Sequence, residues 1–254
     1  MSWDPSIYLK FNDKRTRPAA ELLGRIQVDD PEHVVDLGCG PGNSTALLAA
    51  RWPHAKITGV DSSQEMLDKA ASTDLPAMWT LADIATWRAA VPADVLFTNA
   101  ALQWLGSHQS LFPSLMGEVA PGGTLAIQMP RNFDAPSHTL LREAVEETNN
   151  PVLISLLREN PVADPDVYHR LLTPHASSID IWETTYLQVL SGDDAVLAWT
   201  SGTALVPFTS ALEGTERDRF VNRYRHKLAA AYPPEADGST LFSFKRIFIV
   251  AQKH

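Results

Sequence analysis

Val34-Val35-Asp36-Leu37-Gly38-Cys39-Gly40-Pro41-Gly42-Asn43-Ser44-Thr45 is the stretch that decides the fold. It begins as an apolar strand, passes through a turn with three glycines and continues as a helix. Because glycine has no side chain, such a turn lets the backbone approach a ligand closely and adopt positive φ. Open α/β sheets bind their ligands at the carboxyl ends of the strands, where this turn lies. The stretch therefore predicts the first strand, loop and helix of an α/β sheet, with a ligand site at the loop.

The spacing of the three glycines separates this turn from the dinucleotide-binding fingerprint. The turn reads G-x-G-x-G, whereas dinucleotide-binding folds have G-x-G-x-x-G. Asn43 stands where the third glycine of that fingerprint would fall. An NAD-dependent oxidoreductase is therefore disfavoured, and the sequence offers no apparent catalytic dyad for one.

Short apolar runs alternate with helical patterns from residue 33 to residue 129, which is typical of a parallel sheet with crossover helices. The runs are nearly continuous in apolar character, as expected for strands buried on both faces. They are His33–Leu37, Lys56–Val60, Ala77–Leu81, Asp94–Asn99 and Thr124–Met129. We expect them to form an open, doubly wound sheet.

Two local signals place helices between these strands. Ser62-Ser63-Gln64-Glu65 has the spacing of a capping box, which predicts that a helix begins there. Pro121-Gly122-Gly123 predicts a turn between a helix around Leu111–Val119 and the fifth strand.

After Pro130 the alternation stops, and residues 131–178 are expected to form a helical insertion or cap. Its helices are expected around Ser137–Asn149, Val152–Glu159 and Pro165–Leu172. Strand character returns at Ile179–Leu190 and Leu241–Val250, with helical patterns near Asp193–Gly202 and Thr215–Tyr232 between them. The last two strands predict an antiparallel pair that completes a mostly parallel, seven-stranded sheet.

The chain is therefore expected to be one α/β domain over residues 1–254. Its segments are an N-terminal lid or helix (1–31), a ligand-binding core (32–130), the helical cap (131–178) and a C-terminal part that completes the sheet (179–254).

Composition narrows the class of protein. Of the 254 residues 44% are hydrophobic, enough to bury a sizeable core, and the net charge of −9 disfavours nucleic acid and anionic membranes as partners. Cys39 is the single cysteine, which excludes an intramolecular disulfide and a cysteine metal cluster. With no signal-peptide pattern and no apolar run of membrane length, a cytoplasmic location is expected. We expect no metal site, and the oligomeric state is left open.

Two acids follow the second and third predicted strands. Asp61 comes about twenty residues after the glycine turn, where nucleotide-binding folds place a carboxylate that accepts both ribose hydroxyls. Asp83 with Ile84 follows the third strand, a pair suited to an exocyclic adenine amine and an apolar ring contact.

Taken in order, these elements resemble the Rossmann-like S-adenosylmethionine-dependent methyltransferases, by motif over residues 32–130 and by layout beyond. The resemblance implies S-adenosyl-L-methionine as cofactor and S-adenosyl-L-homocysteine as product. On the methionine side it implies contacts from Gly38, Gly40, Gly42, Asn99 and Ala100, with Asp36 near the amino group. It places Asp61 at the ribose, Met66, Asp83 and Ile84 at the adenine, and Tyr8 and Arg17 in a lid. Ser62 and Trp104 are further cofactor-binding candidates. Packing or backbone capping is the alternative role for Asp36, Met66 and the N-terminal segment with Trp3.

Three further stretches resemble a branch of this family whose bacterial members esterify one carboxylate of a small tricarboxylic acid. They are Trp3-Asp4-Pro5 with Tyr8 and Arg15-Thr16-Arg17-Pro18, Asn99-Ala100-Ala101-Leu102-Gln103-Trp104, and Gln128-Met129-Pro130-Arg131-Asn132-Phe133 with Pro136-Ser137-His138. A carboxylate is ionised at neutral pH and needs no general base to attack a sulfonium methyl. We therefore expect residues that position a small anionic acid rather than a catalytic base.

The candidates for positioning the acid lie after the fourth and fifth strands and in the cap. They are Gln103, Arg131, Asn132, His138, Tyr168 and Arg170, with His169 beside them. A solvated or salt-bridged arginine is the alternative role for Arg131. Another methyl acceptor is an alternative, for example a carrier-bound malonyl group. A second alternative is a regulator that binds the cofactor without turnover. The acidic balance disfavours an RNA methyltransferase.

Overall fold

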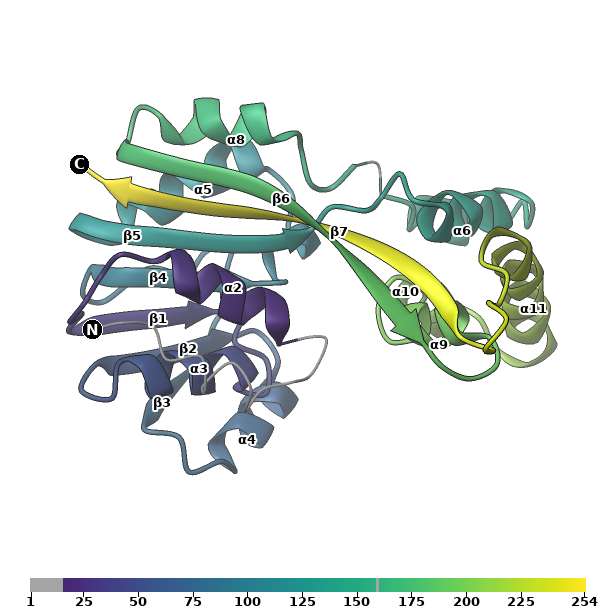
Figure 1. The fold of residues 1–254 in the computed structure, drawn as a ribbon, viewed down its shortest axis with the longest axis horizontal. Coiled ribbons are helices and arrows are strands. Elements are labelled where there is room, and N and C mark those ends of the chain that lie inside the picture. The colour runs from purple at the N-terminus through teal and green to yellow at the C-terminus, as the bar shows by residue number, and fades with distance from the viewer. Residues whose placement is uncertain (1–15, 159) are drawn as a thin grey trace. The chain divides into compact units, whose positions relative to one another are not determined.

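The computed structural model describes residues 16–158 and 160–254, and within them a seven-stranded sheet runs in the order β3-β2-β1-β4-β5-β7-β6 (Figure 1). The strands are β1 (His33–Leu37), β2 (Lys56–Asp61), β3 (Ala77–Leu81), β4 (Ala93–Asn99), β5 (Val119–Pro130), β6 (Ala176–Leu190) and β7 (Thr240–Lys253). β1 pairs in parallel with β2 and β4, β2 with β3, and β4 with β5, whereas β7 is antiparallel to β5. The predicted α/β fold with a mostly parallel, seven-stranded sheet is confirmed.

Helices cover both faces of this sheet. In Figure 1 α2 lies in front of the strands and α5 behind them. The helices are α2 (Arg17–Arg25), α3 (Asn43–Arg51), α4 (Gln64–Ala71), η1 (Leu102–Trp104), α5 (His108–Gly117), α6 (Pro136–Glu146), α7 (Pro151–Ser155), α8 (Pro165–Leu172), α9 (Ala195–Ser201), α10 (Val206–Ser210) and α11 (Gly214–Ala231). With β1 and β4 buried along nearly their whole length, the sheet is doubly wound, as expected.

The helix after β2 begins one residue later than the capping box predicts. Ser63, not Ser62, is the N-cap of α4, and its hydroxyl accepts a hydrogen bond from the backbone N–H of Met66 at 3.3 Å. Glu65 does not return to the cap, because it pairs with Lys69 one turn along the helix at 2.8 Å. Spacing favours Ser62, because Glu65 lies three residues after it, but the cap is made by a hydrogen bond that Ser63 accepts from the backbone, which needs no particular residue three positions on.

The turn predicted at Pro121-Gly122-Gly123 lies inside a strand. β5 begins already at Val119, which pairs with Ala93, and the register shifts before Thr124 pairs with Val95. Gly122 has a φ of +75°, a conformation that glycine adopts without strain. Pro121, Gly122 and Gly123 therefore form an irregularity within β5. They do not form the predicted turn between a helix and the fifth strand.

The described chain forms two compact units. The first contains the residues up to Pro130, together with Pro161–Thr184 and Arg246–His254, and the second contains Arg131–Asn160 and Thr185–Lys245. β6 and β7 each contribute residues to both units. Residues 131–178, which we expected to form one helical cap, are likewise divided between them.

The first unit has its core in the central strands. Val34, Leu37, Phe97, Leu125 and Ile127 are all fully buried. On one face of the sheet Trp182 of β6 stacks on Phe248 of β7 with ring centroids 4.9 Å apart, and Arg25 of α2 lies over Trp182 at 5.1 Å. This contact places α2 on the face to which Phe248 points.

The second unit is built around an apolar cluster from α6, α7, α9, α10, α11 and the adjoining ends of β6 and β7. Two tyrosines fix the start of α6. The hydroxyl of Tyr224 donates to the carbonyl of Ser137 at 2.6 Å, and the N–H of Ser137 donates to the hydroxyl of Tyr232 at 3.0 Å. Both backbone groups of a fully buried residue are thus satisfied by side chains of the α11 segment.

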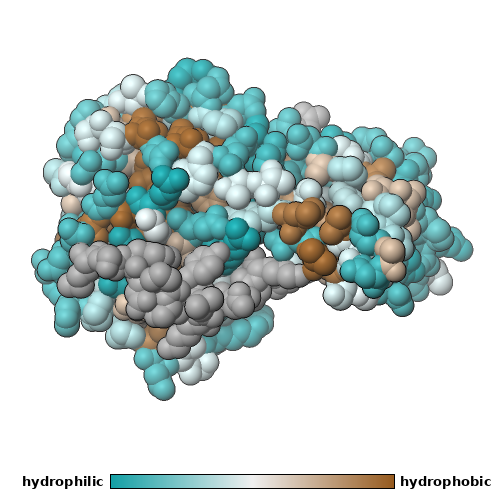
Figure 2. Space-filling model, in the orientation of Figure 1, coloured by the Kyte–Doolittle hydropathy of each residue, from teal (hydrophilic) through white to brown (hydrophobic). Residues whose placement is uncertain are grey.

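Hydrophilic residues cover most of the face drawn in Figure 2, and apolar residues gather there in a few patches. Among residues 16–158 and 160–254, no helix combines the length and the apolar character needed to cross a membrane.

We predict that Tyr224→Phe lowers the free energy of unfolding by about 1 to 3 kcal/mol, because it leaves the buried carbonyl of Ser137 without this donor. Urea unfolding followed by circular dichroism measures the change. Arg219→Gln, at an exposed position of the same helix, is the control and should stay within about 0.5 kcal/mol of the parent. An unchanged unfolding midpoint for Tyr224→Phe would show that this hydrogen bond does not stabilise the second unit.

Candidate active site

Four polar side chains share one face of the sheet at the carboxyl ends of neighbouring strands. Asp36 of β1 pairs with Gly59 of β2 and with Phe97 of β4, so Asp61 and Asn99, two residues further along, point to the same face as Asp36. Asn99 in turn pairs with Gln128 of β5.

A buried arginine extends this row onto β7. Gln128 pairs with Phe248, and Arg246 lies two residues from Phe248, hence on the same face. Arg246 is 8% exposed, and its Nη1 donates to Oε1 of Gln128 at 3.2 Å. We call Asp61, Asp36, Asn99, Gln128 and Arg246 the polar row. Gln128 and Arg246 were not predicted as site residues, because their alignment follows only from the β5–β7 register.

The glycine turn is held against the end of β2. The N–H groups of Gly38 and Cys39 both donate to the carbonyl of Val60, at 2.8 and 3.0 Å. Gly38 has a φ of +78°, and a Cβ there would lie 2.3 Å from Cβ of Ala101, so only glycine fits. A Cβ on Gly40, by contrast, would meet no atom of the described residues within 4 Å. The turn therefore presents open backbone on the side of Gly40, as a ligand cradle requires.

Asp61 ties this turn to the next helix. Its Oδ2 accepts the N–H of Gly40 at 2.9 Å, and its Oδ1 accepts the N–H of Ser63, the N-cap of α4, also at 2.9 Å. Each carboxylate oxygen keeps a further lone pair. Asp61 can therefore hold the loop and at the same time accept hydrogen bonds from two vicinal hydroxyls of a ligand.

Asp36 is fully buried at the end of β1. Its Oδ2 accepts from the hydroxyls of Ser44 at 2.8 Å and Thr45 at 2.6 Å, both on α3. Its Oδ1 has no hydrogen-bond partner in the part of the chain that the structure describes. Burial raises the pKa of Asp36 to about 6, although the two hydroxyl donors oppose the shift. One buried carboxylate oxygen is thus left for a cationic donor such as an ammonium group.

The loop after β4 contains a strained residue. Ala100 has a φ of +55°, a left-handed conformation that is unusual for alanine and that is found preferentially at functional sites. The amide of Gln103 donates to the carbonyl of Ala100 at 2.6 Å, and the N–H of Ala100 donates to the carbonyl of Gln128 at 2.9 Å. Gln103 thus supports the loop itself, while Trp104 is 53% exposed at its tip.

The remaining cofactor candidates lie around this edge or outside the described residues. Ile84 lies close to the glycine turn, 3.2 Å from where a Cβ on Gly38 would be. The exposed Asp83 accepts the N–H of Ala85 at 2.9 Å. Ser62 is exposed and Met66 half-buried at the start of α4. Arg17 opens α2 and pairs with Glu21 at 2.8 Å, whereas Tyr8 and Trp3 fall among the residues that are not described.

Tyr168 and Arg170, expected near the substrate, have other partners within the first unit. Tyr168 is fully buried and stacks on Phe112 with centroids 4.5 Å apart. Its hydroxyl lies 2.8 Å from Nδ1 of His108 and accepts the N–H of Ala163 at 3.0 Å. These contacts give Tyr168 a packing role. Arg170 is exposed on α8 and forms an ion pair with Asp166 at 2.7 Å, and the neighbouring His169 is also exposed.

The other three substrate candidates belong to the second unit. Asn132 is 2% exposed, and neither amide atom has a partner among the residues described. Arg131 is half-buried, and its N–H donates to the carbonyl of Lys245 at 2.9 Å. His138 contacts the ring of Phe133 edge-on at 5.1 Å. Burial, with the nearby Arg142, lowers the pKa of His138 to about 4.

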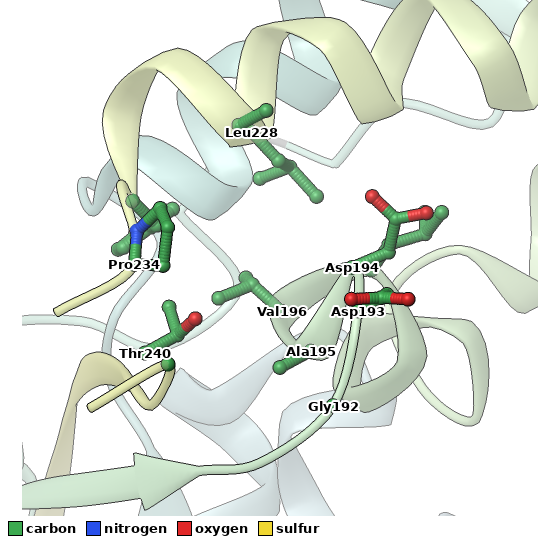
Figure 3. Close-up of a pocket in the computed structure, with 12 residues that line it drawn as sticks. Gly192, Asp193, Asp194, Ala195, Val196, Leu228, Pro234 and Thr240 are labelled. Atoms are coloured by element: carbon green, nitrogen blue, oxygen red, sulfur yellow. The ribbon is translucent and has the colours of Figure 1, made fainter. Parts of the chain in front are cut away.

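A pocket of about 270 Å³ also lies within the second unit (Figure 3). Its wall is mixed, with the apolar side chains of Ala195, Val196 and Leu228 and the carboxylates of Asp193 and Asp194. Asp194 is already paired with Arg225 at 2.8 Å. Among the described residues, none of those expected from the sequence lines this pocket, and we do not assign it to the candidate site.

Together, the first unit offers a cradle of open backbone, one acid with a free buried oxygen and a second acid placed for hydroxyl groups. These groups fit S-adenosyl-L-methionine, which carries an ammonium group and a ribose. In the described ranges, no three His, Cys, Asp or Glu side chains are grouped so that they could hold a metal ion.

Comparison with known proteins finds similar sequences over nearly the whole chain. Residues 34–123 match the family described as "Methyltransferase domain". A trans-aconitate 2-methyltransferase of Klebsiella pneumoniae (strain 342) is 47% identical over 99% of this chain and 98% of its own length. Enzymes of the same name from Azoarcus sp. (strain BH72) and Streptomyces coelicolor are also 47% identical, covering 98% and 99% of this chain and 98% and 87% of theirs.

Solved structures share the fold at low sequence identity. The YcgJ protein from Bacillus subtilis is 14% identical with a TM-score of 0.60, covering 93% of this chain and 98% of its own. A Haemonchus contortus phosphoethanolamine N-methyltransferase 2, solved with phosphomonomethylethanolamine and S-adenosylhomocysteine, is 14% identical with a TM-score of 0.55 and covers 98% of this chain and 57% of its own.

We predict that Asp36→Asn stabilises the ligand-free protein, and more so at neutral than at acid pH. The folded pKa lies above the unfolded value of 3.8, so stability from this carboxyl is present below 3.8 and is lost as the pH rises through about 6. The gain should be about 2 kcal/mol larger at pH 7.5 than at pH 4.5 in urea unfolding. An equal gain at both pH values would contradict a raised pKa for Asp36.

Proposed function

The chain belongs to the family of trans-aconitate 2-methyltransferases, and from this membership we propose that it methylates one carboxylate of trans-aconitate. The cofactor is S-adenosyl-L-methionine, and the products are a monomethyl ester and S-adenosyl-L-homocysteine. The observation that carries the proposal is the 47% sequence identity, over nearly the full length of the chain, to enzymes of that name. The glycine turn with its two acids agrees with it.

We assign the cofactor contacts to the first unit. Asp61 accepts the ribose hydroxyls, and the free oxygen of Asp36 accepts the ammonium group. The open backbone at Gly40 and the strained loop at Ala100 lie on the methionine side. The adenine is contacted by Asp83, Ile84 and Met66. The bound cofactor supplies an electrophilic methyl group on a sulfonium.

The chain's own task in the reaction is to position the acceptor and exclude water. A carboxylate has a reference pKa of about 4, so the attacking oxygen is ionised at neutral pH before it binds. No residue has to remove a proton, and placing the two reactants in line is the main contribution that the protein can make. The buried amide of Asn132, with Arg131 and His138, is proposed to contact the acceptor. Gln103 is proposed to hold the loop after β4.

We further propose that the enzyme acts in the cytoplasm on a free small acid. Cys39 is buried, and the sequence holds no second cysteine for an intramolecular disulfide. The net charge of −9 works against nucleic acid as a partner.

Incubation with methyl-labelled cofactor and a panel of acids tests the function. The panel contains trans-aconitate, shorter dicarboxylic acids and a malonyl thioester. Base-labile label on trans-aconitate, at the highest kcat/KM of the panel, is the expected result. Preference for the malonyl thioester would replace the proposal, and no transfer to any acid would refute it.

We predict that Asp61→Ala weakens binding of S-adenosyl-L-homocysteine roughly ten- to a hundredfold. The substitution removes charged acceptors for the ribose and unties Gly40, and hydrogen bonds to charged groups contribute about 1.5 to 3 kcal/mol each. Calorimetry measures the dissociation constant. Glu65→Gln, which removes an exposed acid of α4 that pairs only with Lys69 in the contacts described, is the control and should bind normally. An unaltered constant for a folded Asp61→Ala would exclude Asp61 from the site.

We predict that kcat at saturating substrates is flat from pH 6 to 8. The nucleophile is ionised throughout this range, and His138, with its pKa lowered to about 4, stays neutral. His138→Gln should therefore keep the same flat profile even if kcat falls. A rise of kcat with an apparent pKa near 6.5 that disappears in this variant would identify His138 as a base and point to a different acceptor.

A further inference from the structure

The polar row is ordered by charge across the sheet. Its acids, Asp61 and Asp36, stand on β2 and β1, neutral amides follow on β4 and β5, and the cation Arg246 stands on β7. Three strand spacings separate the backbones of β1 and β7, which is about 14 Å. A ligand group near Arg246 is therefore met by positive charge, and one near the glycine turn by negative charge.

Gln128 orients this arginine and has a donor of its own. A guanidinium carries only donors, so the amide oxygen of Gln128 must face Arg246 and its Nε2 must point elsewhere. Nε2 is buried and has no hydrogen-bond partner among the described residues. A fully buried amide donor without an acceptor lowers the stability of the fold, unless a ligand accepts its hydrogen bond.

Together these groups form a built recognition site for a carboxylate. The guanidinium supplies several N–H donors in a fixed plane that matches the two oxygens of a carboxylate. At 8% exposure Arg246 is shielded from water and salt, so its attraction for an anion is weakly screened. The backbone pairing of Pro130 with Arg246 joins β5 and β7 without the side chain, so sheet formation does not require an arginine here.

Resting on the proposed function, we propose that Arg246, oriented by Gln128, binds a carboxylate of the acceptor that is not itself methylated. The acids near the glycine turn repel such a group, which favours the β7 end of the row for the anionic acceptor. The methionine carboxylate of the cofactor has the same chemistry and is the other possible source.

Arg246→Met and Arg246→Lys test the assignment, with Arg25→Met as matched control. Arg25 lies on the same face over Trp182, and its side chain is 61% exposed. The kcat/KM for trans-aconitate is compared with that for a dicarboxylic acid, and calorimetry gives the affinities for S-adenosyl-L-homocysteine and for 5′-methylthioadenosine, which lacks the carboxylate.

We expect Arg246→Met to raise KM for trans-aconitate roughly ten- to a hundredfold and to reduce the preference over the dicarboxylic acid, with cofactor affinity unchanged. Arg246→Lys should raise KM for trans-aconitate by a smaller factor, and Arg25→Met should leave KM unchanged. Should Arg246→Met fail to fold, Gln128→Glu keeps the arginine but neutralises it with an isosteric acid, and the same rise in KM is expected.

Two results would overturn the assignment. If Arg246→Met binds S-adenosyl-L-homocysteine more weakly but 5′-methylthioadenosine normally, Arg246 binds the carboxylate of the cofactor and not that of the acceptor. Unchanged KM and affinity in folded Arg246→Met would leave it a structural role. The parent enzyme separates this inference from the proposed function, because a parent that does not methylate trans-aconitate refutes the function whatever the variants do.

Discussion

The parallel register of β1 with β2 and β4 is the constraint on which the candidate site depends. It brings the carboxyl ends of these strands to one edge and sets Asp61, Asp36 and Asn99 on one face. Because strand side chains alternate between faces, a slip of one residue in either pair would turn these groups away from each other. The two hydrogen bonds that Asp61 accepts from the N–H groups of Gly40 and Ser63 then fix the loops that follow the strands.

This edge keeps features that do not favour stability. Asp36 is a buried carboxyl whose raised pKa records the cost of desolvating its charge, and Ala100 adopts a backbone conformation that alanine disfavours. Both are supported locally, Asp36 by two hydroxyls of α3 and Ala100 by the amide of Gln103. Groups held ready in this way need little reorganisation when a charged ligand binds.

Charge distribution reconciles an acidic protein with an anionic acceptor. A net charge of −9 repels a tricarboxylate at long range, but screening by salt limits that repulsion to about 8 Å at physiological ionic strength. Inside the site, recognition depends on single shielded groups. The polar row supplies acids at one end and the arginine at the other, so that two ligands of opposite charge are drawn to different strands.

The sequence by itself determined the fold and located the main residues of the candidate cofactor site. Glycine spacing and apolar runs are local patterns, and they located β1, β3 and α8 to the residue, with Asp36 and Asp61 at strand ends. Contacts between distant residues were beyond such patterns. Only the tertiary structure decided that Ser63 caps α4, that residues 121–123 join β5, that α10 forms, and that Tyr168 is packed against Phe112. It alone aligned Arg246 with Gln128, because the register between strands more than a hundred residues apart depends on side-chain packing across the whole sheet.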